Sequence, residues 1–269
     1  SDLIGGAELT TEALIKRSPR GFKLHSASLT PRLLERNLNK RFVLFNYAAL
    51  PVETIDLIPG SGARYSVVEY DFKHCAWRSE FRHRAQTGQP CDCTETPHGK
   101  RIQKLYEHAD QRYWMSSRQR DLIVARFPGM KRLDSVVLAS VFDTETLDLL
   151  ASLRKRAATN TKDTRVAVLA GGSWIKGIDQ TVAWCKQENR EFVQVGDPDY
   201  KTFLTKLANH QTLAFMPLDY DTCPRVVIEA KLLGLDLILN DNVLHKDEDW
   251  FVGSVEKTEA YLRINADQF

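Results

Sequence analysis

Residues 165–177 read RVAVLAGGSWIKG, which is a short apolar run, two adjacent glycines and a Lys-Gly pair. The apolar run, bounded by glycine, predicts a buried strand from Arg165 to Ala170. Apolar residues then recur at helical spacing from Ile178 to Gln187. A strand that passes through a glycine turn into a helix is typical of nucleotide-binding α/β domains, where the helix N-terminus faces phosphate. This stretch therefore decides the fold class.

The same alternation of strands and helices continues to the end of the chain. It predicts a doubly wound lobe over residues 164–269. Strands are predicted at 192–195, 213–216 and 235–239, and helices at 200–208, at 255–262 and in the latter part of 221–233.

The earlier part of the chain predicts another α/β lobe, over residues 1–142. Its strands are predicted at 41–45, 67–70 and 136–142, and its helices at 7–17, 102–109 and 117–126. Helical and strand periodicity both disappear between residues 73 and 100, a polar stretch with three cysteines and three histidines, which predicts an insertion. Residues 143–163 combine a charged helix with a polar stretch, and we expect them to link the two lobes.

The composition excludes several classes of protein. With 43% hydrophobic and 27% charged residues over 269 positions, wholesale disorder is not expected. No run of eighteen uncharged apolar residues occurs, and the first residues resemble no signal peptide, so neither a transmembrane helix nor secretion is expected. Five cysteines, an odd number without an export signal, favour a reducing, cytoplasmic location.

The formal net charge of +2 hides an asymmetry, because residues 1–142 carry a net +7 and residues 143–269 a net −5. The excess comes from residues 73–132, where 13 Lys and Arg face 6 Asp and Glu. Aromatic residues lie among these cations, a pattern suited to phosphate contacts and base stacking in nucleic-acid binding. A solvated helix face is the plainer alternative. The four aromatic residues are Trp77, Tyr106, Tyr113 and Trp114.

Three short motifs stand out, namely Gly5-Gly6, Lys176-Gly177, and the acids Asp221 and Glu229 eight positions apart. They resemble motifs of retaining GT-B glycosyltransferases of the family-4 type (glycosyl transferases group 1). The counterparts in that family are its first glycine loop, its Lys-Gly pair and its E-x7-E motif, here with Asp in the first position. The resemblance implies a short version of the α/β GT-B fold, with two Rossmann-like lobes facing a central cleft. It also implies a hexosyltransferase of the EC 2.4 type that uses a UDP-, GDP- or ADP-sugar.

The resemblance implies a role for each matching residue. Lys176 would neutralise the donor diphosphate, Glu229 would bind the ribose hydroxyls and Asp221 would contact the donor sugar as a catalytic residue. Gly5 and Gly6 would bring the backbone close to the phosphates. Basic residues and helix N-termini would stabilise the leaving diphosphate, so no catalytic metal is expected.

Two parts of the implied site depart from the family pattern. The arginine that precedes the family's lysine is absent, and Gly172 or Ser173 stands near its place. We expect Arg225 to supply the missing charge, and Gly172, Ser173 and Val226 to belong to the same donor-binding site. For the histidine that family members place against the donor sugar, the nearest candidate is His74, and a loop histidine without a catalytic role is the alternative.

A second cluster has the chemistry of a metal site. Cys75, His83, Cys91 and Cys93 have the pattern C-x7-H-x7-C-x-C, with His74 and His98 as alternative ligands. Three thiolates and one imidazole suit a closed, tetrahedral structural zinc site. Because this spacing is none of the common finger patterns, three free thiols, or a Cys75–Cys91 or Cys75–Cys93 disulfide, stay as alternatives.

These observations predict a glycosyltransferase that moves a sugar from a nucleotide-diphosphate donor to an acceptor hydroxyl. The family resemblance implies that the anomeric configuration is retained. The basic first lobe predicts an anionic acceptor, either modified DNA or a phosphorylated glycan or lipid. Two rival hypotheses stay open. One is a zinc-stapled nucleic-acid-binding protein with a vestigial nucleotide-sugar lobe, and the other is a different GT-B activity such as a sugar epimerase.

Overall fold

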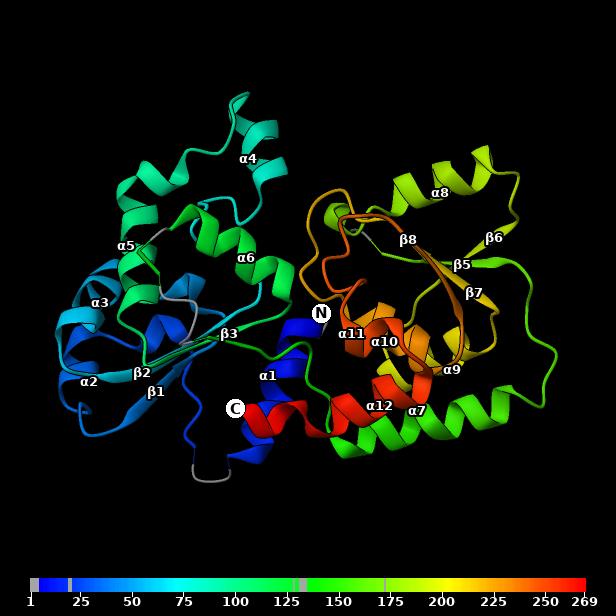
Figure 1. Cartoon of the computed structure of the whole chain (residues 1–269), viewed down its shortest axis with the longest axis horizontal. Coiled ribbons are helices and arrows are strands. Elements are labelled where there is room, and N and C mark those ends of the chain that lie inside the picture. Colours follow the sequence, from blue (N-terminus) through cyan, green and yellow to red (C-terminus); the bar gives the residue numbers. More distant parts are fainter. Residues whose placement is uncertain (1–4, 19–20, 128, 131–134, 172) are drawn as a thin grey trace. The chain divides into compact units, whose positions relative to one another are not determined.

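The computed structural model describes residues 5–18, 21–127, 129–130, 135–171 and 173–269. The chain forms two compact units (Figure 1). One unit is Leu14–Ala139, and the other combines Ser1–Ala13 with Ser140–Phe269. Among the described residues, no helix has the length and apolar character needed to span a membrane.

The Leu14–Ala139 unit is built on a four-stranded parallel sheet in the order β1-β2-β3-β4. Its centre is β2, in which five of six residues are buried. The strands are β1 (Arg41–Leu44), β2 (Arg64–Glu69), β3 (Gln111–Trp114) and β4 (Ser135–Val137). The helices are α2 (Pro31–Glu35), α3 (Val52–Leu57), α4 (Glu80–Thr87), α5 (Pro97–Glu107) and α6 (Ser117–Arg126).

The Ser140–Phe269 unit contains the second parallel sheet, in the order β6-β5-β7-β8. Its strands are β5 (Val166–Leu169), β6 (Phe192–Val195), β7 (Thr212–Phe215) and β8 (Asp236–Leu239). Its helices are α7 (Thr144–Ala157), α8 (Ile178–Gln187), α9 (Tyr200–Ala208), α10 (Arg225–Leu232), α11 (Asp249–Val252) and α12 (Val255–Ile264). Helix α1 (Gly6–Arg17) begins in this unit.

The core of this unit explains why the alternating pattern folds as it does. Val166 and Val168 of β5 pack with Cys185 of α8 and Ala214 of β7. Side chains that alternate along a strand and recur every three to four residues on a helix can meet in one layer. The β5–α8 connection therefore lies on the sheet, with its turn at the carboxyl end of β5.

The observed elements and boundaries differ from the expected ones in four places. The two units divide the chain at 13/14 and 139/140, whereas we expected the first lobe to end at 142. Residues 144–157 are not part of a linker, because α7 buries Leu147, Leu150 and Leu153 in the Ser140–Phe269 unit. The strand expected at 136–142 ends at Val137. The polar stretch 73–100 contains α4, which sequence periodicity did not predict.

Candidate functional site

The carboxyl ends of β5 and β7 form the candidate site. From β5 the chain passes to β6 on one side, and β7 pairs with β5 on the other side. The loops that follow β5 and β7 therefore leave the sheet at its topological switch point. In open α/β sheets, ligands bind outside the carboxyl ends of the strands at this point.

These two loops touch each other through a glycine. Gly177, between the short helical turn Trp174–Lys176 and α8, has φ of +62°. A Cβ atom at this position would lie 1.8 Å from the Met216 carbonyl oxygen, just after β7. The Leu218 amide also donates a hydrogen bond to the Ile175 carbonyl, at 3.2 Å. Glycine is therefore required here both by the backbone conformation and by the close approach of the β7 loop.

The contact brings together the lysine and the acid that the sequence singled out. Lys176 Nζ lies 2.7 Å from Asp221 Oδ2, although 45 positions separate them in the sequence. The Lys176 side chain is 37% exposed and that of Asp221 only 13% exposed. The ammonium group is thus accessible to solvent, and the carboxylate holds it over the carboxyl edge of the sheet.

The Asp221 loop is itself held by the loop that follows β8. The Asp221 amide donates to the Asn242 carbonyl at 2.8 Å, and the Leu244 amide donates to the Asp221 carbonyl at 3.0 Å. The side-chain amides of Asn240 and Asn242 both donate to the Pro217 carbonyl, at 2.9 Å. The position of the Asp221 carboxylate is therefore fixed by backbone pairing on both sides.

Glu229 lies on the second turn of α10 and is almost completely buried. Its Oε1 atom accepts hydrogen bonds from the Tyr200 hydroxyl at 2.6 Å and from Arg225 Nε at 3.0 Å. Burial holds the pKa of the Glu229 carboxyl above its usual value, against the lowering effect of the Arg225 guanidinium. A carboxylate with two donors on one oxygen is oriented, and its other oxygen is a hydrogen-bond acceptor for a ligand hydroxyl.

Arg225 does not present its charge to solvent, in contrast to our expectation. Its Nη1 atom donates to the Val141 carbonyl at 2.6 Å, and its guanidinium lies 3.6 Å from the centre of the Phe142 ring. Only 5% of the side chain is exposed. The guanidinium is engaged by Glu229, a carbonyl and an aromatic face, so its role in this structure is to orient Glu229.

The helix N-termini around Arg225 supply further positive electrostatic potential. Helix α10 begins at Arg225 behind Pro224 and has no side-chain cap, so its first amides lack intrahelical partners. Helix α1 begins at Gly6, where an added Cβ would lie 3.2 Å from Arg225 Cβ. Two helix N-termini are therefore adjacent, Gly5 and Gly6 are exposed, and Val226 is half-buried on the first turn of α10. Such N-termini stabilise anions.

Two further residues were expected in the glycine turn, Gly172 and Ser173. Ser173 is exposed, and its carbonyl accepts the Lys176 amide at 3.1 Å. Its side chain makes no capping hydrogen bond to the short helical turn that follows it. Gly172 lies outside the residues that the structure describes.

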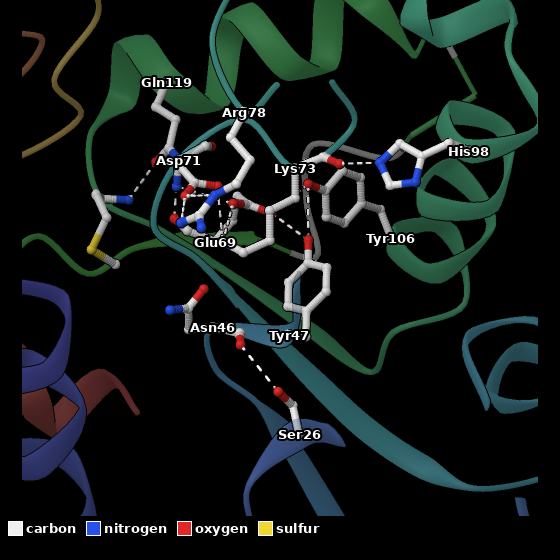
Figure 2. Close-up of polar contacts among 11 residues, drawn as sticks. Ser26, Asn46, Tyr47, Glu69, Asp71, Lys73, Arg78, His98, Tyr106 and Gln119 are labelled. Atoms are coloured by element: carbon white, nitrogen blue, oxygen red, sulfur yellow. Dashed lines mark hydrogen bonds and ion pairs between the residues drawn. The ribbon is translucent and has the colours of Figure 1, made fainter. Parts of the chain in front are cut away.

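A buried polar network occupies the carboxyl end of β2 in the Leu14–Ala139 unit (Figure 2). Glu69 accepts hydrogen bonds from the Tyr47 hydroxyl, from the Tyr106 hydroxyl at 2.5 Å and from Lys73 Nζ at 2.9 Å. Lys73 Nζ also lies 2.9 Å from Asp71 Oδ1. The Lys73 ammonium group and the two tyrosine hydroxyls stabilise the ionised form of Glu69, while burial raises the pKa of its carboxyl above the usual value.

The backbone of this network is fixed as well. Gln119 donates through its amide to the carbonyls of Glu69, at 3.0 Å, and of Asp71, at 2.9 Å. His98 Nε2 lies 2.8 Å from the Lys73 carbonyl oxygen (Figure 2). Asp71 is half-buried and binds Arg78, so it is the acidic member of the network nearest to solvent.

His74 follows this network but is completely buried. Its ring packs edge-on against Phe72 and Phe127, and neither ring nitrogen has a hydrogen-bond partner in the described part of the chain. Burial lowers the pKa of His74 to about 4. A ring in this position has no surface to offer a donor sugar, so the structure gives His74 a place in the core rather than the catalytic role implied by the resemblance.

The four cysteine and histidine residues of the expected metal site converge. Cys75, His83, Cys91 and Cys93 each offer one ligand atom, and all four atoms lie within 4.8 Å of one another. All five cysteines of the chain are free thiols in the structure, including Cys75 and Cys93. His98 instead contacts the Lys73 carbonyl, and neither ring nitrogen of His74 has a hydrogen-bond partner in the described chain.

The expected surface of cations and aromatic rings exists only in part. Tyr106, Tyr113 and Trp114 are in the core of the Leu14–Ala139 unit, so these three rings are not available to stack on bases. Arg112 is also buried and donates to the Tyr106 carbonyl. Trp77 is the one aromatic residue of the four that is exposed, and it lies beneath Arg82. Apolar packing of β3 explains this outcome, because residues 111–114 form a buried inner strand.

Sequence reasoning missed the partners of several site residues. Tyr200 orients Glu229, Phe142 covers Arg225, and Tyr47 with Tyr106 binds Glu69. The only sequence signal was that Tyr200 lies at the start of a helix that follows Gly-Asp-Pro. A strand end and a helix start at the same sheet edge bring such residues together.

The fold has solved counterparts. The crystal structure of Anabaena Alr3699/HepE in complex with UDP-glucose matches 98% of this chain and 86% of that chain, with a TM-score of 0.53 and 12% identity. That of Alr3699/HepE in complex with UDP and glucose matches 99% and 87%, with a TM-score of 0.55 and 13% identity. No protein-family model matches the chain, and no curated protein matches it in sequence. The α/β, two-lobe GT-B fold predicted from the sequence is therefore confirmed.

Proposed function

We propose that this chain is a glycosyltransferase that moves a sugar from a nucleotide-diphosphate sugar to an acceptor hydroxyl. The observation that supports it most is the meeting of Lys176, Asp221 and the α10 N-terminus at the switch point of the β6-β5-β7-β8 sheet. The fold is shared with a protein crystallised with UDP-glucose, which supports a nucleotide-sugar donor. UDP is accordingly our first choice among UDP-, GDP- and ADP-sugars.

Each group has a distinct role in the proposed reaction. The free Glu229 oxygen accepts hydrogen bonds from the ribose hydroxyls, while Tyr200 and Arg225 hold the carboxylate in place. Lys176 and the first amides of α10 and α1 stabilise the diphosphate. The bond between the anomeric carbon and the diphosphate oxygen breaks, the acceptor oxygen bonds to that carbon, and the acceptor proton passes to the leaving diphosphate.

The Lys176–Asp221 pair is part of this proposal. The Asp221 carboxylate lies 2.7 Å from the Lys176 ammonium group and neutralises it. An arriving diphosphate would share the ammonium group, and Asp221 would then accept a hydrogen bond from a sugar hydroxyl. The pair keeps the lysine oriented until the donor binds, so less conformational entropy is lost on binding.

Our proposals for the acceptor and for the stereochemical outcome rest on the sequence. The family resemblance implies retention of the anomeric configuration. The basic residues of the Leu14–Ala139 unit favour an anionic acceptor, although the burial of Tyr106, Tyr113 and Trp114 removes the stacking platform that single-stranded DNA would use. A phosphorylated glycan or lipid is therefore our first choice.

Phosphorus and proton NMR of a reaction mixture tests the proposal. The chain is incubated with UDP-glucose, with and without a mixture of phosphorylated glycan acceptors. We expect UDP release that depends on the acceptor, and the anomeric coupling constant of the product reports retention or inversion. Isomerised donor in the absence of acceptor would instead identify an epimerase, and an unchanged donor together with DNA binding would identify the nucleic-acid-binding alternative.

A further inference from the structure

The Leu14–Ala139 unit contains a cluster of metal-ligating side chains far along the chain from the proposed donor residues. Cys75 Sγ lies 3.8 Å from Cys93 Sγ and 3.8 Å from His83 Nδ1, and Cys93 Sγ lies 3.3 Å from the same nitrogen. A tetrahedral zinc ion, with bonds of about 2.3 Å to sulfur and about 2.0 Å to nitrogen, separates two sulfurs by about 3.8 Å and sulfur from nitrogen by about 3.5 Å. The observed distances match these tetrahedron edges.

The histidine of the cluster has the environment of a metal ligand. Its Nδ1 atom faces the two sulfurs, and its Nε2 atom lies 3.8 Å from Asp92 Oδ1 on the opposite side of the ring. Histidine ligands of metals usually direct their second nitrogen to a carboxylate or carbonyl, which fixes the tautomer. The Asp92 carboxylate is thus near enough to become the hydrogen-bond partner of Nε2 when Nδ1 binds a cation.

Apolar packing does not explain why α4 is held in place. Among the eight residues of α4, only His83 is buried, and Phe81 is 45% exposed. A helix of this length has little stability in isolation, and most helices in proteins depend on a buried apolar face. The buried contact of α4 with the unit therefore depends on His83, and through it on the cysteines.

The cysteines join three segments that are otherwise connected by polar loops. Cys75 follows the β2 network, Cys91 is half-buried in the loop after α4, and Cys93 begins the short helical turn Cys93–Glu95 before α5. Gly99 of α5 packs closely on this turn, because an added Cβ would lie 1.9 Å from the Cys93 carbonyl oxygen. One ion at the cluster would bind α4 and the start of α5 to the carboxyl end of β2.

From this geometry we propose that Cys75, His83, Cys91 and Cys93 bind one zinc ion, which fixes α4 and the loop 71–78 at the end of β2. Four protein ligands close a tetrahedral site and leave no position for substrate, so the ion has a structural role. Its three thiolates favour zinc over magnesium or calcium, which prefer oxygen ligands. The proposal does not depend on the donor site, because the ligands all belong to the other unit.

The test is metal analysis of the full chain purified under reducing conditions and supplied with zinc. We expect about one zinc ion per chain, and replacement by Co²⁺ should give the absorption of tetrahedral cobalt with thiolate charge-transfer bands. Cys93→Ser should lose the metal. Cys185→Ser is the matched control, because Cys185 is also completely buried but lies in the core of the other unit, and this variant should keep the metal.

Two further measurements do not depend on the folding of the variants. A chelator should lower the Tm of the wild-type chain, and hydrogen exchange should increase in residues 73–96 while β1, β2 and β3 stay protected. Wild-type protein without zinc after reconstitution, or with a mass two daltons below that of the reduced chain, would overturn the proposal, the latter in favour of a disulfide. So would metal content that Cys93→Ser leaves unchanged.

Discussion

The close contact between Gly177 and the β7 loop makes a quantitative prediction. In Gly177→Ala, the new methyl group would lie 1.8 Å from the Met216 carbonyl oxygen and 2.9 Å from Pro217 Cα, at φ of +62°. The left-handed conformation costs an alanine about 1–2 kcal/mol. The backbone atoms at these short distances must also move, which adds a penalty similar to that of overpacking, about 1–3 kcal/mol. The two penalties together predict a destabilisation of about 2–5 kcal/mol.

Gly234→Ala is the matched control in the same unit. Gly234 has φ of +75°, but an added Cβ would meet only the Arg154 side chain, at 3.8 Å, which is an ordinary contact. Loss of chain entropy in the unfolded state partly offsets the conformational penalty. We therefore expect the control to lose about 1 kcal/mol, so the difference between the two variants isolates the contact between the loops.

Native-state hydrogen exchange of the β5 and β7 amides is the assay, because the two units can open separately and a single Tm would mix them. We expect the free energy of opening of the β7 amides to fall more in Gly177→Ala than in Gly234→Ala, by at least about 1 kcal/mol. Equal losses in the two variants would refute the claim that the β5 and β7 loops meet at Gly177.

Two other variants test the electrostatics of each unit. His245, completely buried beside Trp250 and Phe251, has its pKa lowered to about 3 by burial, so its contribution to stability is present above the ordinary pKa near 6.5 and is lost as pH falls toward 3. When pH falls from 6.5 to 5, the free energy of unfolding in urea should decrease by about 1.5 kcal/mol less in His245→Phe than in the wild type. Equal decreases would contradict the lowered pKa of His245. Tyr106→Phe removes a hydrogen bond to the Glu69 carboxylate and should cost about 2 kcal/mol, whereas Tyr65→Phe removes one to the Leu105 carbonyl and should cost about 1 kcal/mol; a reversed order in urea unfolding would argue against an ionised Glu69.

The sequence predicted the Ser140–Phe269 sheet well, for a physical reason. Three of its strands, β5, β6 and β7, are followed within two residues by glycine or proline. Its helices have a clear buried face, as in α8, which packs on β5. The spacing from Asp221 to Glu229 then placed one acid in a loop and the other on a helix. The spacing of a motif does not predict which residues bind its side chains. Tyr200 and Val141, for example, are distant in sequence from Glu229 and Arg225, which they bind.

The Leu14–Ala139 unit was harder to predict, because several of its polar residues are buried and form hydrogen bonds with one another. Lys73 and Glu69 belong to residue types that are seldom buried, yet both lie in the core as a hydrogen-bonded pair. Helix α4 has one buried residue and so shows no apolar periodicity. Arg225 was misjudged for the same reason, since its guanidinium is buried by Glu229 and Phe142 rather than free for phosphate.

The affinity of the chain for UDP-glucose, measured by isothermal titration calorimetry, tests the central claim most directly. Lys176→Met removes a positive charge of the site that is accessible to a diphosphate, and Lys206→Met removes a lysine of the same unit that binds Asp197 at the surface. A charge-assisted hydrogen bond of about 1.5–3 kcal/mol predicts affinity about 10- to 100-fold weaker in Lys176→Met. The account predicts binding by the wild type, this loss in Lys176→Met and unchanged affinity in Lys206→Met. Absence of binding by the wild type to UDP-, GDP- and ADP-sugars alike, or equal affinity in the two variants, would contradict it.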